Sequence, residues 1–206
     1  CESEYEYAFI GFLEAEGWKY SSGNNIHRVT KRDILIVDDF KKFIADTNLD
    51  LTEDEVIQIY DNVRLVGAES DFATLHKVYG WMVSGVQFTP QDGLPRMIPL
   101  IDFDNLDKNI FRVVNQFTVE YTNNGQKENR RPDVLLFVNG IPLCVIELKN
   151  PADANATIYD AWEQINIRYW RDIPHLLHYC PLACISDGVK TRLGTVRTPY
   201  EHFYAW

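Results

Sequence analysis

Apolar residues in the first part of the chain recur at the spacing of amphipathic helices. Within residues 3–16, Tyr5, Phe9, Phe12 and Leu13 are placed on one side of a helix, and Gly17 follows as a stop signal. The same periodicity predicts further helices, over residues 38–46, 53–65 and 71–79. The residues before the second of these form a capping-box sequence, and we expect Gly80 to end the last helix.

The period changes after the fourth predicted helix, where short apolar or β-branched runs alternate with polar turns. These runs predict one helix over 156–170 and strands over 85–89, 97–103, 110–121, 133–138, 141–149, 182–186 and 193–197. Because the runs at 133–138 and 141–149 are apolar at nearly every position, we expect central strands buried on both faces. The sequence therefore predicts one α/β (α+β) domain over 1–206, with a mostly helical part at 1–80 and a mixed sheet at 81–206.

Asn139-Gly140 joins the two buried runs and is a strong hairpin signal. The hairpin register matters because a slip of one residue turns a side chain to the opposite face of the sheet. With a two-residue turn, Asp133 would point away from the face that carries Glu147 and Lys149. With a three-residue loop, all three side chains would share one face. We therefore predict a G1-bulge turn with Gly140 at positive φ, and the alternative is a break in the strand at Pro132-Asp133.

Asp133, Glu147 and Lys149 are the candidate catalytic residues. A carboxylate and an ammonium at the end of an apolar strand are costly to bury without partners, and a lone Glu-x-Lys pair is most simply a structural salt bridge. A second carboxylate at the matching end of the neighbouring strand favours chemistry instead. Asp133 and Glu147 can hold Mg²⁺, or Mn²⁺ in its place, which polarises a phosphate and activates a bound water. Lys149 can orient that water or neutralise developing charge, so the pattern indicates phosphodiester hydrolysis.

These residues resemble the PD-(D/E)xK nuclease signature, through Arg131-Pro132-Asp133 and Ile146-Glu147-Leu148-Lys149-Asn150-Pro151. Further segments make the resemblance more specific and extend it through nearly the whole chain. In order, they are the Glu6 helix ending at Gly17-Trp18, Asn109-Ile110-Phe111, Asn115-Gln116-Phe117, Ala161-Trp162-Glu163-Gln164, Ile185-Ser186-Asp187-Gly188, Arg192 and Gly194. This ordered set resembles the N-terminal nuclease domain of type I restriction enzyme R (motor) subunits.

The resemblance implies a restriction-endonuclease-like fold, with a mixed central sheet flanked by helices, and Mg²⁺-dependent cleavage of double-stranded DNA. It also implies an ATP-driven translocase later in the same polypeptide, so that ATP serves motor domains outside these residues. We expect the chain, which ends at Trp206, to be a fragment of a longer subunit. That subunit would assemble with modification and specificity subunits, which read the DNA sequence.

One departure from the family pattern concerns the helix after the lysine strand. Nucleases of this kind carry Gln-x-x-x-Tyr there, whereas Gln164 is followed four residues later by Arg168 and five residues later by Tyr169. On an α-helix, Gln164 and Arg168 share a face, and Tyr169 is turned by about another 100°. Gln164 is the expected catalytic member. Either Arg168 contacts a phosphate instead, or the helix shifts locally to present Tyr169, or Tyr169 is simply a core aromatic.

The net charge of −10 argues against a nucleic-acid partner until its distribution is considered. Residues 1–125 hold 11 Lys and Arg against 21 Asp and Glu, whereas residues 126–206 hold nine of each kind. A DNA face is therefore expected on the second part, where the candidate contacts are Arg130, Arg131, Arg168, Tyr169, Lys190 and Arg192. Because neutralising phosphates supplies most non-specific affinity, we expect the domain alone to bind DNA weakly.

The number of cysteines and the length of the apolar runs indicate the cellular compartment of the protein. The sequence has four cysteines, no visible signal peptide and no apolar run long enough to cross a membrane, which favours a cytoplasmic protein without a disulfide framework. The set His175, His178, Cys180 and Cys184 lacks the usual spacing of zinc ligands. We therefore expect these cysteines to be buried as small hydrophobic residues.

Two further acidic residues have alternative interpretations. Glu6 either approaches the metal site or is an exposed charge on an amphipathic helix, and the helix pattern favours exposure. Asp187-Gly188 is explained by a turn between strands as well as by catalysis.

Three functions are compatible with the sequence. The first is the nuclease domain of a type I restriction motor subunit, and the second is a stand-alone repair or recombination nuclease of the same fold. The third is a docking module that keeps the fold without cleaving. The intact Asp133, Glu147 and Lys149 favour a nuclease, whereas the displaced Tyr169 and the acidic charge favour the docking module.

Overall fold

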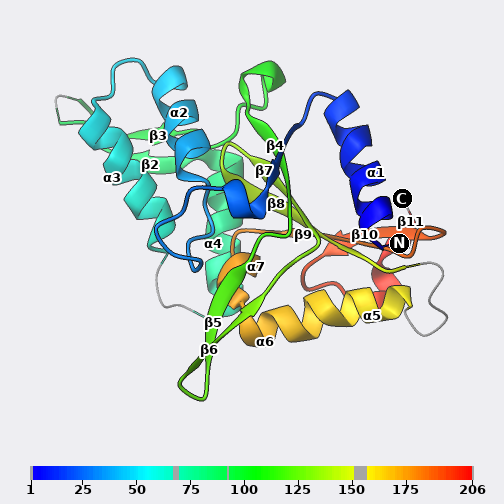
Figure 1. Cartoon of the computed structure of the whole chain (residues 1–206). Coiled ribbons are helices and arrows are strands. Elements are labelled where there is room, and N and C mark those ends of the chain that lie inside the picture. Colours follow the sequence, from blue (N-terminus) through cyan, green and yellow to red (C-terminus); the bar gives the residue numbers. More distant parts are fainter. Residues whose placement is uncertain (1, 67–69, 92, 151–156, 206) are drawn as a thin grey trace.

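A seven-stranded mixed β-sheet runs through the centre of the protein in the computed structural model (Figure 1). The structure describes residues 2–66, 70–91, 93–150 and 157–205. In spatial order the strands are β1 (Lys19–Ser22), β4 (Phe111–Asn115), β7 (Val134–Val138), β8 (Ile141–Leu148), β9 (Leu182–Ser186), β10 (Thr191–Thr195) and β11 (Tyr204–Ala205). β1 is parallel to β4 and β8 to β9, and the other neighbouring pairs are antiparallel.

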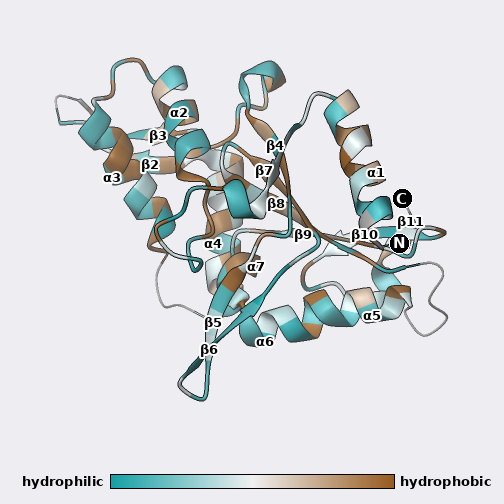
Figure 2. Cartoon of the chain, viewed as in Figure 1, coloured by the Kyte–Doolittle hydropathy of each residue, from teal (hydrophilic) through white to brown (hydrophobic). Residues whose placement is uncertain are grey.

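The prediction of central, buried strands is confirmed for β7 and β8, whose residues are nearly all buried. Figure 2 shows mostly hydrophobic residues along these central strands. Two small sheets lie outside the central one. They pair β2 (Val86–Phe88) with β3 (Arg96–Ile98), and β5 (Val119–Asn123) with β6 (Gln126–Arg130).

Helices pack on both faces of the sheet. α1 (Glu2–Ala15) places Ile10 against Val113, Val134 and Ile146 on one face. The neighbouring residues Val114, Leu135 and Val145 point to the other face, as the alternation of strand side chains requires, and join the larger core. That core also contains residues of α2 (Val37–Thr47), α3 (Glu53–Arg64), α4 (Asp71–Ser84), α5 (Ile158–Glu163) and α7 (Pro174–Leu177). The α/β expectation is therefore confirmed.

Between α5 and α7 the helix continues through a π-helical segment, η3 (Gln164–Tyr169), into α6 (Trp170–Asp172). Three short 3₁₀ turns complete the elements: η1 (Gly23–Asn25), η2 (Leu106–Lys108) and η4 (Tyr200–His202).

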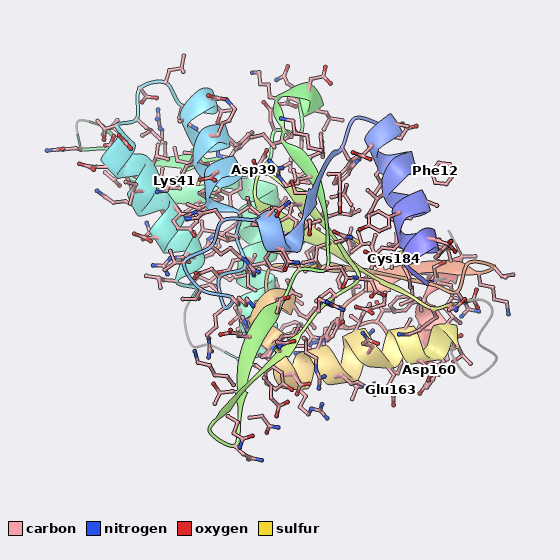
Figure 3. All side chains as sticks on the ribbon, viewed as in Figure 1. Phe12, Asp39, Lys41, Asp160, Glu163 and Cys184 are labelled. Atoms are coloured by element: carbon pink, nitrogen blue, oxygen red, sulfur yellow. The ribbon has the colours of Figure 1, made fainter. Side chains whose placement is uncertain are left out.

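The four N-terminal helices form where the periodicity predicts them, and the capping box between Thr52 and Glu55 is present. Two details differ. Phe12 is 74% exposed and points away from the sheet (Figure 3), because it lies on a different side of α1 from Phe9 and Leu13.

The other difference concerns the end of α4, which continues through Gly80 to Ser84, so the prediction that Gly80 ends it was wrong. One glycine costs a helix only roughly 1 kcal/mol, and Val78 and Met82 are buried in the core on either side of it. The helix ends instead at Gly85, which has a φ of +84° and whose N–H donates to the carbonyl oxygen of Trp81 at 2.8 Å.

The predicted strand over 110–121 is in fact two strands, β4 and β5. Gln116 separates them with a φ of +54° and donates its N–H to the carbonyl oxygen of Asp133 at 3.1 Å. The break lets β5 leave the central sheet. The predicted strand over 97–103 is only β3, and β1, which pairs with β4, carries no apolar alternation that could have predicted it.

The β7–β8 hairpin has a two-residue turn, so the predicted G1-bulge turn was wrong. Val138 pairs with Ile141, and Asn139 and Gly140 have φ values of +52° and +77°. Two consecutive residues at positive φ are typical of a type I′ turn, whose twist matches that of the flanking strands. The predicted positive φ of Gly140 is confirmed.

The turn sets one pairing register between β7 and β8, and a bulge inside β8 shifts that register by one residue. Phe137 pairs with Pro142 but Leu136 pairs with Cys144, so Leu143 is an additional residue on β8. Beyond the bulge the register places Asp133 opposite Glu147. The bulge therefore brings the two carboxylates to one face, which the sequence analysis had expected from the turn.

The histidine and cysteine residues considered as zinc ligands have other surroundings in the structure. Cys180 and Cys184 are fully buried, as expected, and His178 contacts Asp71 at 2.9 Å. No group of three or more histidine, cysteine or acidic side chains is arranged around a common point in the described part of the chain. Within the same residues, no helix has both the length and the apolar character needed to cross a bilayer.

The two Asn-Gly turns give a matched test of the hairpin. A Cβ on Gly140 would lie 2.3 Å from the carbonyl oxygen of Ile36 and 2.9 Å from the nitrogen of Phe40, whereas a Cβ on Gly125, whose φ is +78°, meets nothing within 4 Å. We expect Gly140→Ala to lower the free energy of unfolding by roughly 3 kcal/mol or more. Gly125→Ala should lower it by only about 1 kcal/mol, the conformational cost alone. Equal losses in urea unfolding would contradict the close packing of this turn on α2.

Candidate active site

Asp133 lies immediately before β7 and is held from two sides. Its side-chain Oδ2 accepts the backbone N–H of Leu148 at 2.8 Å, and its carbonyl oxygen accepts the N–H of Gln116 at 3.1 Å. The carboxylate is thus tied directly to the end of β8, where Glu147 lies. The prediction that Asp133 and Glu147 share one face of the sheet is what the structure shows, although the register places Asp133 opposite Glu147 and not opposite Val145.

Glu147 has no exposed surface, and both of its carboxylate oxygens accept hydrogen bonds. Gln164 Nε2 donates to one oxygen at 2.7 Å, and Tyr169 Oη donates to the other at 2.5 Å. The amide oxygen of the same Gln164 accepts a hydrogen bond from Lys149 Nζ at 2.9 Å. Gln164 therefore connects Lys149 to Glu147, and the four side chains form one hydrogen-bonded group with Asp133 beside it.

A π-helical turn resolves the unusual spacing of Gln164 and Tyr169. The segment Gln164–Tyr169 is π-helical, and in a π-helix residues five apart lie one above the other. Gln164 Nε2 consequently lies 2.9 Å from Tyr169 Oη. Of the alternatives from the sequence, the local shift of the helix is the one observed. Tyr169 is also buried in the core. It is therefore both a core aromatic residue and a member of the site, which the sequence analysis treated as alternatives.

Arg168 lies on the outer side of this turn. Its guanidinium contacts Glu163 at 3.1 Å, and both side chains are partly exposed. Figure 3 shows Glu163 and Asp160 on α5, the helix that leads into the turn. Arg168 therefore does not lie beside Gln164, and its contact with a phosphate stays a prediction.

The two carboxyl groups of the site hold protons more tightly than ordinary ones. Burial, and then the charge of Asp133, raise the pKa of Glu147 well above its usual value. Burial also raises the pKa of Asp133, although the N–H of Leu148 opposes this shift. Burial and the nearby Glu147 raise the pKa of Tyr169, so its phenol is a neutral donor. Two neighbouring carboxylates repel one another, so together they attract a cation.

Glu6 is buried, so the expectation that it is exposed was wrong. Its two oxygens accept hydrogen bonds from Asn115 Nδ2 at 2.6 Å and from Gln116 Nε2 at 2.9 Å. Burial raises the pKa of Glu6, and the charge of Asp133 contributes to the same shift. α1 thus brings a third carboxyl group near Asp133. The two amide side chains that hold it were part of the family resemblance, although nothing in the helical pattern of α1 could have placed Glu6 inside.

Ser186 at the end of β9 belongs to a segment of the family resemblance, but the sequence assigned it no role of its own. Its hydroxyl contacts the Tyr5 hydroxyl at 2.9 Å and the Thr191 hydroxyl at 2.8 Å, and its carbonyl oxygen accepts the N–H of Lys149 at 2.8 Å. The following Asp187 accepts the backbone N–H groups of Val189 and Lys190, as the turn interpretation expects.

The residues predicted to contact DNA differ in their exposure and in whether they already have a partner within the protein. Arg131 and Lys190 are exposed. Arg130 forms an ion pair with Asp172 at 2.6 Å, and the Arg192 guanidinium lies 5.0 Å from the Tyr200 ring. Arg130 and Arg192 therefore have structural partners in the protein, and their contact with DNA stays a prediction.

The residues at this site suit Mg²⁺. Asp133 and Glu147 supply hard oxygen donors, and no ion pair to either is found among the described residues, since Lys149 Nζ is directed to Gln164. Mg²⁺ is commonly held by one or two carboxylates and keeps several waters, which a site with two carboxylates allows. Each carboxylate oxygen has two lone pairs, so the hydrogen bonds to Glu147 leave capacity for a metal.

The raised pKa of Glu147 predicts how stability depends on pH without metal. The folded-state pKa lies above the ordinary value of 4.5, so the folded protein keeps a proton that the unfolded chain has released. Stability should therefore fall as pH rises from about 4.5 toward neutrality. We expect Glu147→Gln to flatten this decline and raise the melting temperature at neutral pH, measured in EDTA. Glu163→Gln, at a partly exposed carboxylate, should keep the wild-type slope, and equal slopes in wild type and Glu147→Gln would contradict the assignment.

Comparisons with known proteins agree with the family seen in the sequence. A family model described as the N terminus of the type I restriction enzyme R protein matches residues 2–202. A putative type I restriction enzyme MjaIXP endonuclease subunit from Methanocaldococcus jannaschii is 34% identical over 211 residues, covering 98% of this chain and 20% of that protein. The type I restriction enzyme HindI endonuclease subunit from Haemophilus influenzae is 30% identical over 219 residues, covering 100% of this chain and 20% of that protein.

The chain thus spans about a fifth of the length of these relatives, and it aligns with them along nearly all of its own length. The family model likewise covers every element that contributes to the site, from α1 to β10. The chain belongs to the family of type I restriction enzyme R protein N-terminal domains.

Proposed function

We propose that this domain hydrolyses phosphodiester bonds of double-stranded DNA with the help of Mg²⁺, for which Mn²⁺ can substitute. The observation that carries the proposal is the convergence of Asp133, Glu147, Lys149 and Gln164 on one end of the central sheet. Such an arrangement of two carboxylates and a lysine serves the needs of this reaction, which must place a water in line and neutralise charge on the phosphate.

Each residue has a distinct task in the proposed mechanism. Asp133 and Glu147 would hold the cation, which when bound polarises the phosphate and lowers the pKa of a coordinated water. Lys149, directed by Gln164, orients the attacking water or stabilises negative charge that develops on the phosphate. Gln164 and Tyr169 fix the Glu147 carboxylate in one orientation, so that little reorganisation is needed during the reaction.

We also propose a place for the domain in a larger enzyme. The relatives are named as endonuclease subunits of type I restriction enzymes, and this chain corresponds to a fifth of their length. The domain would be the cutting part of an ATP-dependent restriction complex in the cytoplasm. ATP would act on motor domains outside these residues, and modification and specificity subunits would be its partners. The contact of Gln164 with Tyr169 removes one argument for a docking module without cleavage.

The metal site can be tested with one pair of aspartates. We expect Asp133→Asn to weaken Mn²⁺ binding and to slow cleavage of duplex DNA by roughly 100-fold or more, because a ligand is lost. Asp187→Asn is the matched control, since its side-chain oxygen can still accept the N–H groups of the turn. Isothermal titration gives the Mn²⁺ affinity independently of activity. Equal Mn²⁺ affinity in wild type and Asp133→Asn would overturn the proposed site.

The π-helical turn can be tested by changing its length. Deleting Ile167, which is 48% exposed, should convert the turn to an α-helix in which Gln164 and the tyrosine are four residues apart. The two side chains would still share a face, so we expect Mn²⁺ affinity close to that of the wild type. Tyr169→Phe removes the donor to Glu147 and should weaken Mn²⁺ binding by roughly 10-fold or more.

An alanine inserted after Asn166 provides the opposite change in length. It would move the tyrosine six residues from Gln164 and out of line with it, so Mn²⁺ binding should weaken as in Tyr169→Phe. If the deletion and the insertion had the same effect, the contact between Gln164 and Tyr169 would not be what the turn preserves.

A further inference from the structure

β5 and β6 form a two-stranded ribbon that stands apart from the central sheet (Figure 1). Its two arms join the protein next to the candidate active site. β5 follows Gln116, whose N–H bonds to the carbonyl oxygen of Asp133 at 3.1 Å, and β6 ends at Arg130, three residues before Asp133. The ribbon therefore begins where the proposed reaction takes place.

The outer half of the ribbon is polar, and it carries no acidic residue in an acidic domain. Figure 2 shows this part in the hydrophilic colour. The segment 122–127 reads Thr-Asn-Asn-Gly-Gln-Lys, and every residue of it is exposed. Lys127 is 84% exposed, lies 4.0 Å from Glu120 across the strands, and gives the segment its single charge. Uncharged amides both donate and accept hydrogen bonds, which suits contact with base edges and phosphates.

The ribbon is a stiff extension. Its strands pair over five consecutive residue pairs, and Asn124 and Gly125 close them with φ values of +48° and +78°. At the base, Arg130 forms an ion pair with Asp172 of α6 at 2.6 Å. Tyr121 donates to Glu128 across the strands at 2.6 Å. Because the tip is already held at a fixed distance from Asp133, little conformational entropy is lost when a partner binds to it.

Basic side chains surround the base of the ribbon. The Arg28 guanidinium lies 3.8 Å from the centre of the Phe117 ring, where β5 begins. The exposed Lys31 accepts the backbone N–H of Glu120 at 3.0 Å through its carbonyl oxygen. Arg131, also exposed, follows β6 directly. The acids around the base have partners, since Asp172 pairs with Arg130 and Arg171, Glu128 accepts bonds from Tyr121 and Asn123, and Glu120 lies 4.0 Å from Lys127. This distribution favours a polyanionic partner at the base.

We propose that the β5–β6 ribbon enters a groove of duplex DNA beside the phosphate held at Asp133 and Glu147. The amide-rich tip would contact the groove, and Arg28, Lys31 and Arg131 would contact the backbone on either side. A five-residue strand is about 17 Å long, and the major groove, about 12 Å wide, admits a two-stranded ribbon. The inference rests on the proposed function, and it adds a surface that positions the duplex for cutting.

A pair of charge changes at the tip tests the ribbon. In Gln126→Glu/Lys127→Glu both side chains are exposed, and the turn residues are untouched. Gln87→Glu/Lys108→Glu is the matched control, with the same change in charge at exposed positions on β2 and η2. Affinities for a labelled duplex and for one of its strands are measured by fluorescence anisotropy in Ca²⁺, across a range of salt concentrations. We expect the tip variant to bind duplex about tenfold more weakly, with a salt dependence reduced by about one unit of slope.

The control should bind duplex like the wild type, and single-strand binding should change less than duplex binding in the tip variant. Unchanged duplex binding in the tip variant, or an equal loss in the control, would overturn the ribbon proposal. An equal loss for single strands would also overturn it, because a groove would then not be involved. If Asp133-dependent cleavage persists while the tip variant binds normally, only the ribbon proposal fails. A wild-type chain that neither binds nor cuts duplex DNA would overturn the proposed function as well.

Discussion

The burial of one carboxylate, that of Glu147, is the constraint on which the rest of the site depends. A charged or polar group without solvent is costly unless its hydrogen-bonding capacity is met. Glu147 has no exposed surface and lies at the end of an otherwise apolar strand. The donors that compensate it come from a different part of the chain, the turn that follows α5. The helix must therefore present both donors at once, and the sheet must bring Asp133 to the same face.

Two local irregularities meet these requirements. Leu143 is an additional residue in β8, and it sets the register that places Asp133 opposite Glu147. The π-helical segment Gln164–Tyr169 absorbs an additional residue in the helix, and it keeps its first and last side chains in contact. Bulges and π-turns each cost regular hydrogen bonding, so they persist where something else depends on them. Here both adjust the direction of side chains around the same carboxylate.

The sequence was sufficient for the elements whose periodicity is strong and for the expectation that Asp133, Glu147 and Lys149 lie close together. The apolar runs of β7 and β8 predicted central strands, and Asp133, Glu147 and Lys149 followed from their positions at the strand ends. The requirement that Asp133 and Glu147 share a face was correct, but the irregularity that satisfies it was placed in the turn instead of in β8. A run of apolar residues has no alternation that would reveal a bulge, and the local signal for one is Pro142, which lies directly beside the additional residue. Glu6 was misplaced for a related reason. Its burial depends on Asn115 and Gln116, whose position next to α1 is set by the fold and not by the helix itself.

The spacing of Gln164 and Tyr169 has a consequence for how relatives are recognised. A sequence pattern that demands a fixed number of residues between glutamine and tyrosine would reject this chain, although the two side chains touch. One inserted codon in a helix can be accommodated as a π-turn, and one deleted codon can remove it again, while the contact survives both events. Members of such a family can therefore differ in spacing and still share one constellation of atoms. What the π-turn preserves is a distance in space, and a pattern that allows either spacing would match proteins that a stricter one misses.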